Sequence, residues 1–387
     1  MPVDAMTVEA MAGKARPVDA LVIGAGQAGL SAAYHLRRRG FQPTDAAHAE
    51  SRTFVVLDAD ESPGGAWRHR WQSLRMGTVN GIHELPGFPV PPADAALPAR
   101  EVLPAYFGEY EERFDLRVRR PEPVRSVTRE DDDPRGRLMA DVGPPGNARY
   151  AARYVVNATG TWTKPFWPRY PGQGTFAGRQ LHVAQYAAAE EFAGKRVVIV
   201  GAGVSAIQLL EEISRVAETY WMTRREPQWI DDDFDIPARV AAIARVEDRV
   251  RRGLAPGSVV SVTGMRWTPS ARRAEARGVL VRYPMFVAVE PEGVRMPDGS
   301  LVVADVILWA TGFRSALDHL APLRLRVPGG GIRVDDSRAT DEPRLFLIGY
   351  GPSASTIGAN RAGRSVAARI VADIDGQEVA RSSPSRS

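Results

Sequence analysis

The feature that most constrains the fold of this chain is a pattern that occurs twice. Residues Asp19–Arg39 and Arg196–Val216 each combine a short apolar run, a glycine-rich turn and a segment with apolar residues at helical spacing. The apolar run predicts a buried strand, and the spacing after the glycines predicts an amphipathic helix. Such strand–turn–helix units build parallel sheets. Two copies therefore predict an α/β protein with two Rossmann-like, three-layer domains.

The first turn, Gly24-Ala-Gly26-Gln-Ala-Gly29, has the spacing of a dinucleotide-binding turn. Gly24 permits a tight bend, Gly26 lets backbone N–H groups reach a pyrophosphate, and Gly29 lets helix and strand pack closely. The next predicted strand, Thr53–Leu57, ends at Asp58, whose carboxylate can accept from ribose hydroxyls. Asp58 lies farther along than the usual ~20 residues, which predicts an insertion after the helix. A turn made for packing alone is the alternative. The candidate contacts are Gly24, Gly26, Gln27, Ala28, Gly29 and Asp58.

The second turn, Gly201-Ala-Gly203-Val-Ser-Ala206, has alanine at the third position, which the fingerprint tolerates. Its next predicted strand, Thr219–Thr223, is followed by Arg224 and Arg225 instead of an acid. A carboxylate would repel a 2′-phosphate, whereas a guanidinium group binds it bidentately. We therefore expect NADPH rather than NADH here, with a solvated arginine pair as the alternative. The candidate contacts are Gly201, Gly203, Val204, Ser205, Ala206, Arg224 and Arg225.

Two further segments repeat each other, Tyr154–Gly160 and Val306–Phe313, and each is a predicted strand that ends in Ala-Thr-Gly. The order glycine turn, Ala-Thr-Gly, glycine turn, Ala-Thr-Gly predicts that one nucleotide domain is inserted into the other. Further candidate contacts are Thr159, Gly160, Thr311 and Gly312. We expect a disordered leader at residues 1–16, a first domain at 17–162 and 310–378, a second domain at 163–309 and a disordered tail at 379–387.

The composition of the chain argues against several classes of protein function. The chain has 387 residues, which suits two domains, and no apolar run reaches the roughly 18 residues of a membrane-spanning helix. It has no cysteine, which excludes a redox-active cysteine pair and thiolate metal sites. The net charge of +4 is spread along the chain without a recognition motif, so we expect neither a nucleic-acid nor a membrane partner. The acidic run Asp231–Asp233 is interpreted as a solvated loop, with a metal site as the alternative, so no metal is predicted. A cytoplasmic location is expected.

Two motifs resemble the flavin-containing monooxygenase superfamily, and the resemblance covers about residues 18–370. Gly64-Gly65-Ala-Trp67, followed by Trp71-Gln-Ser73-Leu74, is similar to the family's GGxW segment along the flavin. The segment from Phe176 to Tyr186, which contains Gly178 and His182, is similar to its fingerprint FxGxxxHxxx(W/Y), which joins the domains and supports NADPH function. Taken alone, His182 would be a hydrogen-bonded histidine between domains. The resemblance implies FAD in the first domain and NADPH in the second. It adds the cofactor contacts Gly65, Trp67, Leu74, Val124 and His182.

Parts of the chain depart from the family pattern. Gly77 stands where flavin-containing monooxygenases carry an asparagine beside the flavin, and Asn80, three residues later, need not replace it. The segment Leu347–Tyr350 lacks the aspartate of disulfide reductases, which argues against that branch. The last helix is expected to start near the flavin ring, where its dipole favours the anionic reduced form. Candidate contacts there are Gly349, Ser353, Thr356 and Asn360.

The resemblance implies an FAD- and NADPH-dependent oxidoreductase, namely a monooxygenase. NADPH would reduce FAD by hydride transfer, and molecular oxygen would then form a C4a-peroxyflavin that oxygenates a nitrogen, sulfur or carbonyl group of a small-molecule substrate. No side chain is assigned a catalytic role. Two alternatives stay open: an oxidase or dehydrogenase that uses the same sites, which Gly77 favours, and a nucleotide-sensing protein without turnover. The substrate and the formation of a homodimer are also left open.

Overall fold

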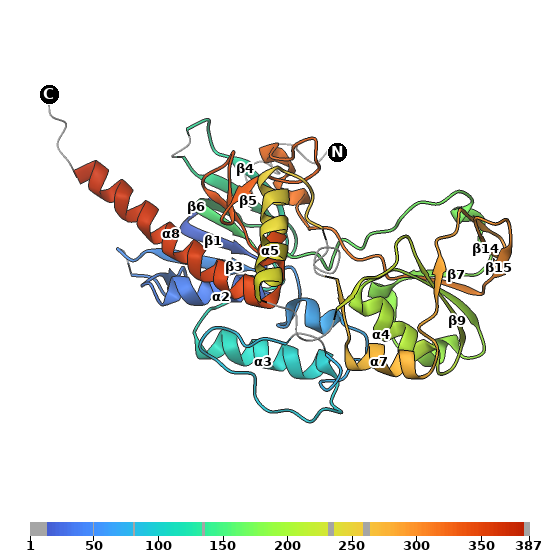
Figure 1. Cartoon of the computed structure of the whole chain (residues 1–387). Coiled ribbons are helices and arrows are strands. Elements are labelled where there is room, and N and C mark those ends of the chain that lie inside the picture. The colour runs from blue at the N-terminus through green and yellow to red at the C-terminus, as the bar shows by residue number, and fades with distance from the viewer. Residues whose placement is uncertain are drawn as a thin grey trace, which may run out of the picture.

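The structure is a computed structural model that describes residues 14–48, 50–79, 82–133, 136–230, 236–257 and 264–382. It has two lobes, each built on a sheet that contains parallel strands (Figure 1). In the first lobe the strands run in the order β17-β18-β19-β6-β1-β3-β2, with β5 beside β6 and β4 beside β5. These strands are β1 (Arg16–Ile23), β2 (Gln42–Pro43), β3 (Thr53–Leu57), β4 (Val124–Arg129), β5 (Leu138–Val142), β6 (Arg149–Asn157), β17 (Val334–Asp335), β18 (Arg338–Ala339) and β19 (Leu345–Leu347).

The central strands of the first sheet are parallel, and their last residues lie side by side. Ile23 pairs with Leu57 on one side and with Asn157 on the other, and Asn157 pairs with Leu347. The segments that follow β1, β3, β6 and β19 therefore all emerge at the same edge. In doubly wound sheets this edge is where ligands bind.

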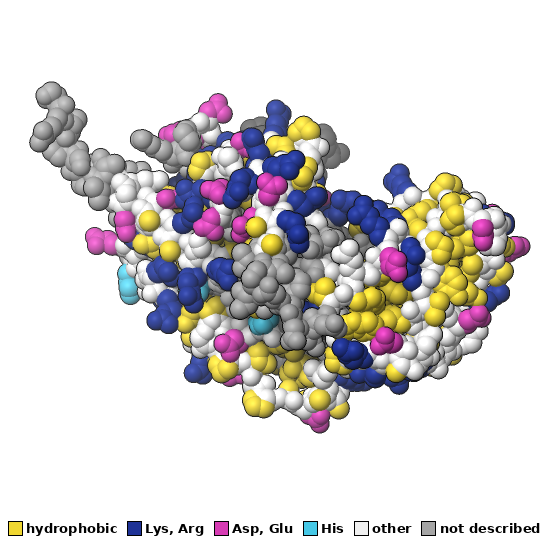
Figure 2. Space-filling view, viewed as in Figure 1, with side chains coloured by type: hydrophobic (Ala, Val, Ile, Leu, Met, Phe, Trp, Pro, Cys, Tyr) yellow, Lys and Arg dark blue, Asp and Glu magenta, His cyan; other side chains and the backbone are white. Residues whose placement is uncertain are grey.

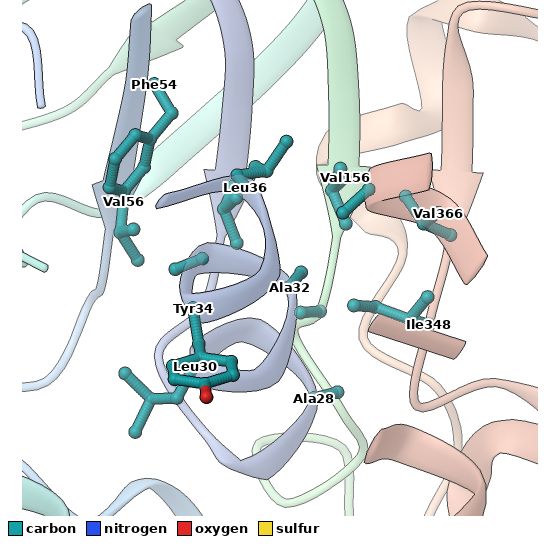
Figure 3. Packing of buried hydrophobic residues seen from close by; sticks show 14 of the residues in the cluster. Ala28, Leu30, Ala32, Tyr34, Leu36, Phe54, Val56, Val156, Ile348 and Val366 are labelled. Atoms are coloured by element: carbon teal, nitrogen blue, oxygen red, sulfur yellow. The ribbon is translucent and has the colours of Figure 1, made fainter. Parts of the chain in front are cut away.

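The two faces of the first sheet are covered differently. Helices α2 (Gln27–Arg37) and α8 (Thr356–Ser382) pack on one face, where Ala32, Leu36 and Val366 meet Val56 and Val156 (Figure 3). Helix α3 (Ala99–Arg113) adds aromatic side chains to the same core. The opposite face is covered by the β4–β5 hairpin and the 3₁₀ turn η5 (Asp318–Leu323).

The second sheet is parallel throughout, in the order β12-β9-β8-β16-β7. Helix α4 (Val204–Ile213) covers one face together with α7 (Pro269–Ala276), and an antiparallel three-stranded sheet covers the other. The strands are β7 (Arg179–His182), β8 (Arg196–Val200), β9 (Glu218–Thr223), β12 (Arg282–Pro284) and β16 (Val306–Trp309), with β13 (Ala288–Glu290), β14 (Gly293–Arg295) and β15 (Leu301–Val303) in the small sheet. The remaining elements are β10 (Trp229–Ile230), β11 (Met265–Arg266), α5 (Ile236–Arg251), η1 (Gly65–His69), η2 (Gln173–Thr175), η3 (Val183–Gln185), η4 (Ala189–Phe192) and η6 (Gly351–Ala354).

The predicted α/β class with two Rossmann-like halves is confirmed, and the second sheet's strands lie between β6 and β17 in sequence. Two elements reach into the terminal segments that were expected to be disordered. Strand β1 begins at Arg16, inside the expected leader, and α8 continues to Ser382, past the expected start of the tail. The expected insertion after the first helix contributes β2 to the sheet edge, because Gln42 pairs with Thr53. Residues 1–13, 383–387 and the acidic run Asp231–Asp233 lie outside the described residues, and the domain boundaries stay a prediction.

Candidate functional site

Both glycine turns lie at the edges where the parallel strands end. In the first, Gly24 has a φ of +99°, and a Cβ there would lie 2.7 Å from the carbonyl oxygen of Ala158. A Cβ on Gly29 would lie 1.8 Å from the carbonyl oxygen of Gly24. A Cβ on Gly26, by contrast, would meet no atom within 4 Å. Gly24 and Gly29 are thus required by packing, whereas Gly26 keeps a space open beside the start of α2.

The second turn repeats this arrangement. A Cβ on Gly201, which has a φ of +141°, would lie 2.2 Å from the carbonyl oxygen of Ala310, and a Cβ on Gly203 would meet nothing within 4 Å. Ala206, at the third position, is fully buried. Gly26 and Gly203 are the N-caps of α2 and α4, so no side chain caps either helix start. The uncapped N–H groups can therefore bind phosphate oxygens, and both turns fit a dinucleotide. The residues that supply these groups are Gln27, Ala28, Val204 and Ser205.

The chain crosses between the lobes twice, the first time after β6 and the second time after β16. The two Ala-Thr-Gly repeats lie at these crossings and fasten each of them. The Thr159 hydroxyl donates to the carbonyl oxygen of Ala316 at 2.6 Å, and the Thr311 hydroxyl donates to that of Phe166. The repeats also supply the alanine carbonyls that face the first glycine of each turn. The sequence showed the repeat, and the structure explains it by this packing. Ala316 and Phe166 also donate their N–H groups to the glycines that end the motifs, Gly160 and Gly312.

Asp58 is buried at the end of β3 and faces the first turn. Its Oδ2 accepts from the Ala25 N–H at 2.6 Å, and its Oδ1 accepts from the Asp60 N–H at 2.8 Å. Arg120 lies 4.0 Å from this carboxylate and forms a bidentate pair with Glu111 at 2.7 Å. Each carboxylate oxygen has a further lone pair, so Asp58 can hold the turn and also accept from a ribose hydroxyl. Nothing in the sequence indicated Arg120 or Glu111 as its neighbours.

The segment 64–74, which follows β3 and Asp58, contacts both lobes and is called the bridging segment. A Cβ on Gly65, which has a φ of +49°, would lie 2.9 Å from the Cα of Gly26, so η1 begins against the first glycine turn. Trp67 packs against the apolar cores of both lobes. Leu74 is buried beside Trp71 in the core of the second lobe. This segment therefore spans the space between the two predicted nucleotide sites.

The contacts expected at the start of α8 have structural partners. The buried Ser353 hydroxyl donates to the Tyr350 carbonyl oxygen at 2.8 Å and accepts from the Tyr350 N–H at 3.2 Å. Asn360 accepts from Gln27 Nε2 at 2.9 Å and donates to the Glu84 carbonyl oxygen at 2.8 Å. The Ser353 bonds fix the turn before α8, the Asn360 bond to Gln27 holds the start of α8 against α2, and a flavin contact for either side chain stays a prediction. Of the other predicted contacts, Gly349 precedes η6 with a φ of +70°, and Thr356 and Val124 begin α8 and β4.

His182 is fully buried at the end of β7. Its Nε2 lies 3.0 Å from the Gly312 carbonyl oxygen, and its Nδ1 accepts from the Ala184 N–H at 3.1 Å. These partners require a neutral ring with its proton on Nε2, and burial lowers the pKa of the ring. The edge of the ring faces Phe313, with 5.0 Å between ring centres. His182 therefore fastens the end of β7 to Gly312, which follows the neighbouring strand β16, and its roles as an interdomain residue and as a cofactor contact stay predictions.

Arg224 and Arg225 follow β9 and are exposed. Within the described residues neither guanidinium group has a hydrogen bond or an ion pair, so both are available to an anion. The neighbouring Arg282, on β12, donates from Nε to the Thr223 hydroxyl at 2.9 Å and brings a third guanidinium to the end of β9. The sequence did not indicate Arg282, because only the pairing of β12 with β9 places it there.

Gly77, the departure from the family pattern, is confined by its neighbours. Its N–H donates to the Ala95 carbonyl oxygen at 2.9 Å, and a Cβ there would lie 2.9 Å from the Ala95 Cβ. An asparagine at this position would require the backbone or Ala95 to shift. Asn80, the alternative, lies outside the described residues.

Two further features of the described residues concern metal binding and membrane-spanning helices. The described part of the chain contains no group of three or more His, Asp or Glu residues that could hold a metal ion. Among its helices, none is long and apolar enough to cross a membrane. On the face seen in Figure 2, Lys and Arg side chains are spread over both lobes among Asp and Glu.

Fold and site together define a protein with two dinucleotide-binding halves. The profile of the pyridine nucleotide-disulphide oxidoreductase family matches residues 21–264, more than half of the chain. A solved structure of a flavin-containing monooxygenase from Stenotrophomonas maltophilia is 38% identical, covers 93% of this chain and 99% of its own, and has a TM-score of 0.76. The chain therefore belongs to the pyridine nucleotide-disulphide oxidoreductase family, and within it to the flavin-containing monooxygenases. This confirms the resemblance found in the sequence, and the chain is an oxidoreductase.

Two curated relatives share part of the chain. A Baeyer-Villiger monooxygenase from Streptomyces coelicolor is 30% identical over 64% of this chain and 44% of its own length. An indole-3-pyruvate monooxygenase from Oryza sativa subsp. japonica is 30% identical over 51% of this chain and 45% of its own length. This chain thus matches less than half of each of these two relatives.

Proposed function

We propose that this chain is an FAD- and NADPH-dependent monooxygenase that oxygenates a nitrogen, sulfur or carbonyl group of a small organic molecule. The observation that carries the proposal is a difference in charge between two similar turns. A buried carboxylate, Asp58, closes the first, and the free guanidinium groups of Arg224 and Arg225 close the second. A carboxylate suits ribose hydroxyls, and guanidinium groups suit a 2′-phosphate.

The chain's own residues bind and orient the two dinucleotides. The uncapped start of α2 and the space beside Gly26 would hold the pyrophosphate of FAD. The start of α4 and the space beside Gly203 would hold that of NADPH. FAD, when bound, supplies the redox chemistry by accepting hydride from NADPH and passing electrons to oxygen. The bridging segment with Trp67 would exclude water from the region between the sites.

The three relatives described above are monooxygenases, which supports oxygen insertion. The absence of cysteine argues against dithiol chemistry of the disulfide reductase kind. One observation favours a second candidate, an NADPH oxidase that releases peroxide. Gly77 and the close approach of Ala95 leave no room for the asparagine expected beside the flavin. The proposed partners are a small organic molecule and molecular oxygen, and the proposed location is the cytoplasm.

The test has two stages on the FAD-loaded protein. In anaerobic stopped flow, NADPH should bleach the flavin absorbance faster than NADH at the same concentration. Air is then admitted with an amine, a sulfide or a ketone, while oxygenated product and hydrogen peroxide are both quantified. Product that accounts for most of the NADPH consumed supports the monooxygenase. Stoichiometric peroxide without product supports the oxidase, and no bleaching would overturn both.

A further inference from the structure

Arg70 directly follows η1 and lies between three tryptophan rings. Its guanidinium carbon is 4.9 Å from the centre of the Trp162 ring, 5.5 Å from Trp67 and 6.0 Å from Trp71. Trp67 and Trp71 belong to the segment that bridges the lobes, and Trp162 belongs to the first crossing. Trp162 in turn stacks on Phe313 of the second crossing, with ring centres 4.9 Å apart. Arg70 therefore stands where both crossings and the bridging segment meet.

The charge of Arg70 has no counter-charge among the described residues. Its Nε is buried without a hydrogen-bond partner, and it forms no ion pair there. Burial lowers the pKa of this side chain. The buried arginines Arg120 and Arg344, in contrast, form bidentate pairs with Glu111 and Glu342.

Aromatic faces compensate only part of this cost. Desolvation disfavours the charged guanidinium group, and the cation–π contacts offset part of this effect but give the buried Nε hydrogen no acceptor. An anion brought by a ligand would supply the rest. In the proposed function the phosphates of the two dinucleotides would have other partners, namely the starts of α2 and α4 and the Arg224–Arg225 pair. The organic substrate is therefore the ligand that would bring an anion to Arg70.

Resting on the proposed function, we propose that Arg70 binds a carboxylate of the substrate, and that the partly exposed rings of Trp67 and Trp162 pack against its apolar or aromatic body. The guanidinium fork matches a carboxylate bidentately, and flat rings suit a flat apolar group. The substrate class is thus an aromatic or apolar carboxylic acid. Arg70 is a specificity-determining residue in this proposal, and it has no part in cofactor binding.

The experiment compares (phenylthio)acetate with its methyl ester, two thioethers that differ in charge. Binding to the FAD-loaded protein is followed by quenching of tryptophan fluorescence, which needs no turnover, and sulfoxide formation is measured separately. Wild type should bind the acid about 10- to 100-fold more tightly than the ester, the factor expected for a charge-assisted pair. Arg70→Gln should abolish this preference while ester binding stays within about twofold, and Arg70→Lys should retain part of it. Arg68→Gln, at a neighbouring arginine that contacts the Ser62 carbonyl oxygen, is the matched control and should behave as wild type.

Each outcome decides a different question. Equal wild-type affinity for acid and ester would overturn the inference, and so would an Arg70→Gln variant that weakens both ligands equally or slows flavin reduction without substrate. Arg70→Lys guards against a folding defect, because it keeps the charge and most of the volume. If the acid preference is present and lost in Arg70→Gln but neither probe is oxygenated, the binding inference holds and the monooxygenase proposal fails.

Discussion

His319 shows how a single residue at the site edge couples its protonation to stability. Its Nε2 lies 2.7 Å from the amide oxygen of Asn157, an acceptor that requires an N–H on the ring. Burial lowers the pKa of His319 from 6.5 to about 4. In the unfolded chain the ring keeps its ordinary pKa of about 6.5. Between these two values the unfolded state binds the extra proton, so stability is full above pH 6.5 and falls as the pH drops toward 4.

We expect His319→Gln to reduce this acid sensitivity. Between pH 7 and pH 5 the free energy of unfolding of the wild type should fall by about 2 kcal/mol through His319 alone, and the variant should lose that much less. Urea unfolding at both pH values measures the difference. His48→Gln, which replaces an exposed histidine, serves as the control. Equal losses in His319→Gln and wild type would contradict the prediction.

At the scale of the element, two glycines at the start of α2 have different roles, Gly29 in folding and Gly26 in cofactor binding. A Cβ at Gly29 collides with the Gly24 carbonyl oxygen, whereas a Cβ at Gly26 meets only open space. We expect Gly29→Ala to lower the free energy of unfolding by more than about 2 kcal/mol. Gly26→Ala should cost at most about 1 kcal/mol, yet weaken FAD binding more than about tenfold, because its methyl group fills the space of the pyrophosphate. Thermal unfolding of the apoprotein and FAD titration separate the two effects, and a Gly26→Ala protein with wild-type FAD affinity would refute the assignment of this turn.

The sequence predicts those elements whose signal is local. The two strand–turn–helix units carry strand, glycines and helix within one stretch each, and the structure contains them as β1–α2 and β8–α4. Arg282 and His319 have no such signal, because they reach the site through contacts with residues far along the chain, Thr223 and Asn157. Composition also does not fix where a terminal element starts or stops, and β1 begins at Arg16 while α8 ends at Ser382.

At the scale of the whole molecule, the lobes are joined by apolar packing as well as by the two crossings. Leu74 precedes the second sheet in sequence, yet it is buried in the hydrophobic core of the second lobe, in the same cluster as Trp71 and Leu210. Gln208 of α4 also donates to the Thr78 carbonyl oxygen at 2.9 Å. The proposed hydride transfer requires the two dinucleotide sites to stay in register, so this packing bears on the proposed activity as well as on stability.

We therefore expect Leu74→Ala to do more than leave a cavity. The substitution should cost about 2–5 kcal/mol, and it should uncouple the lobes, so that one calorimetric unfolding transition becomes two. Leu138→Ala removes the same side chain from the core of the first lobe alone and should lower a single transition without splitting it. If the two variants unfold alike, Leu74 stabilises its core without coupling the lobes, and the crossings alone hold the two sites in register.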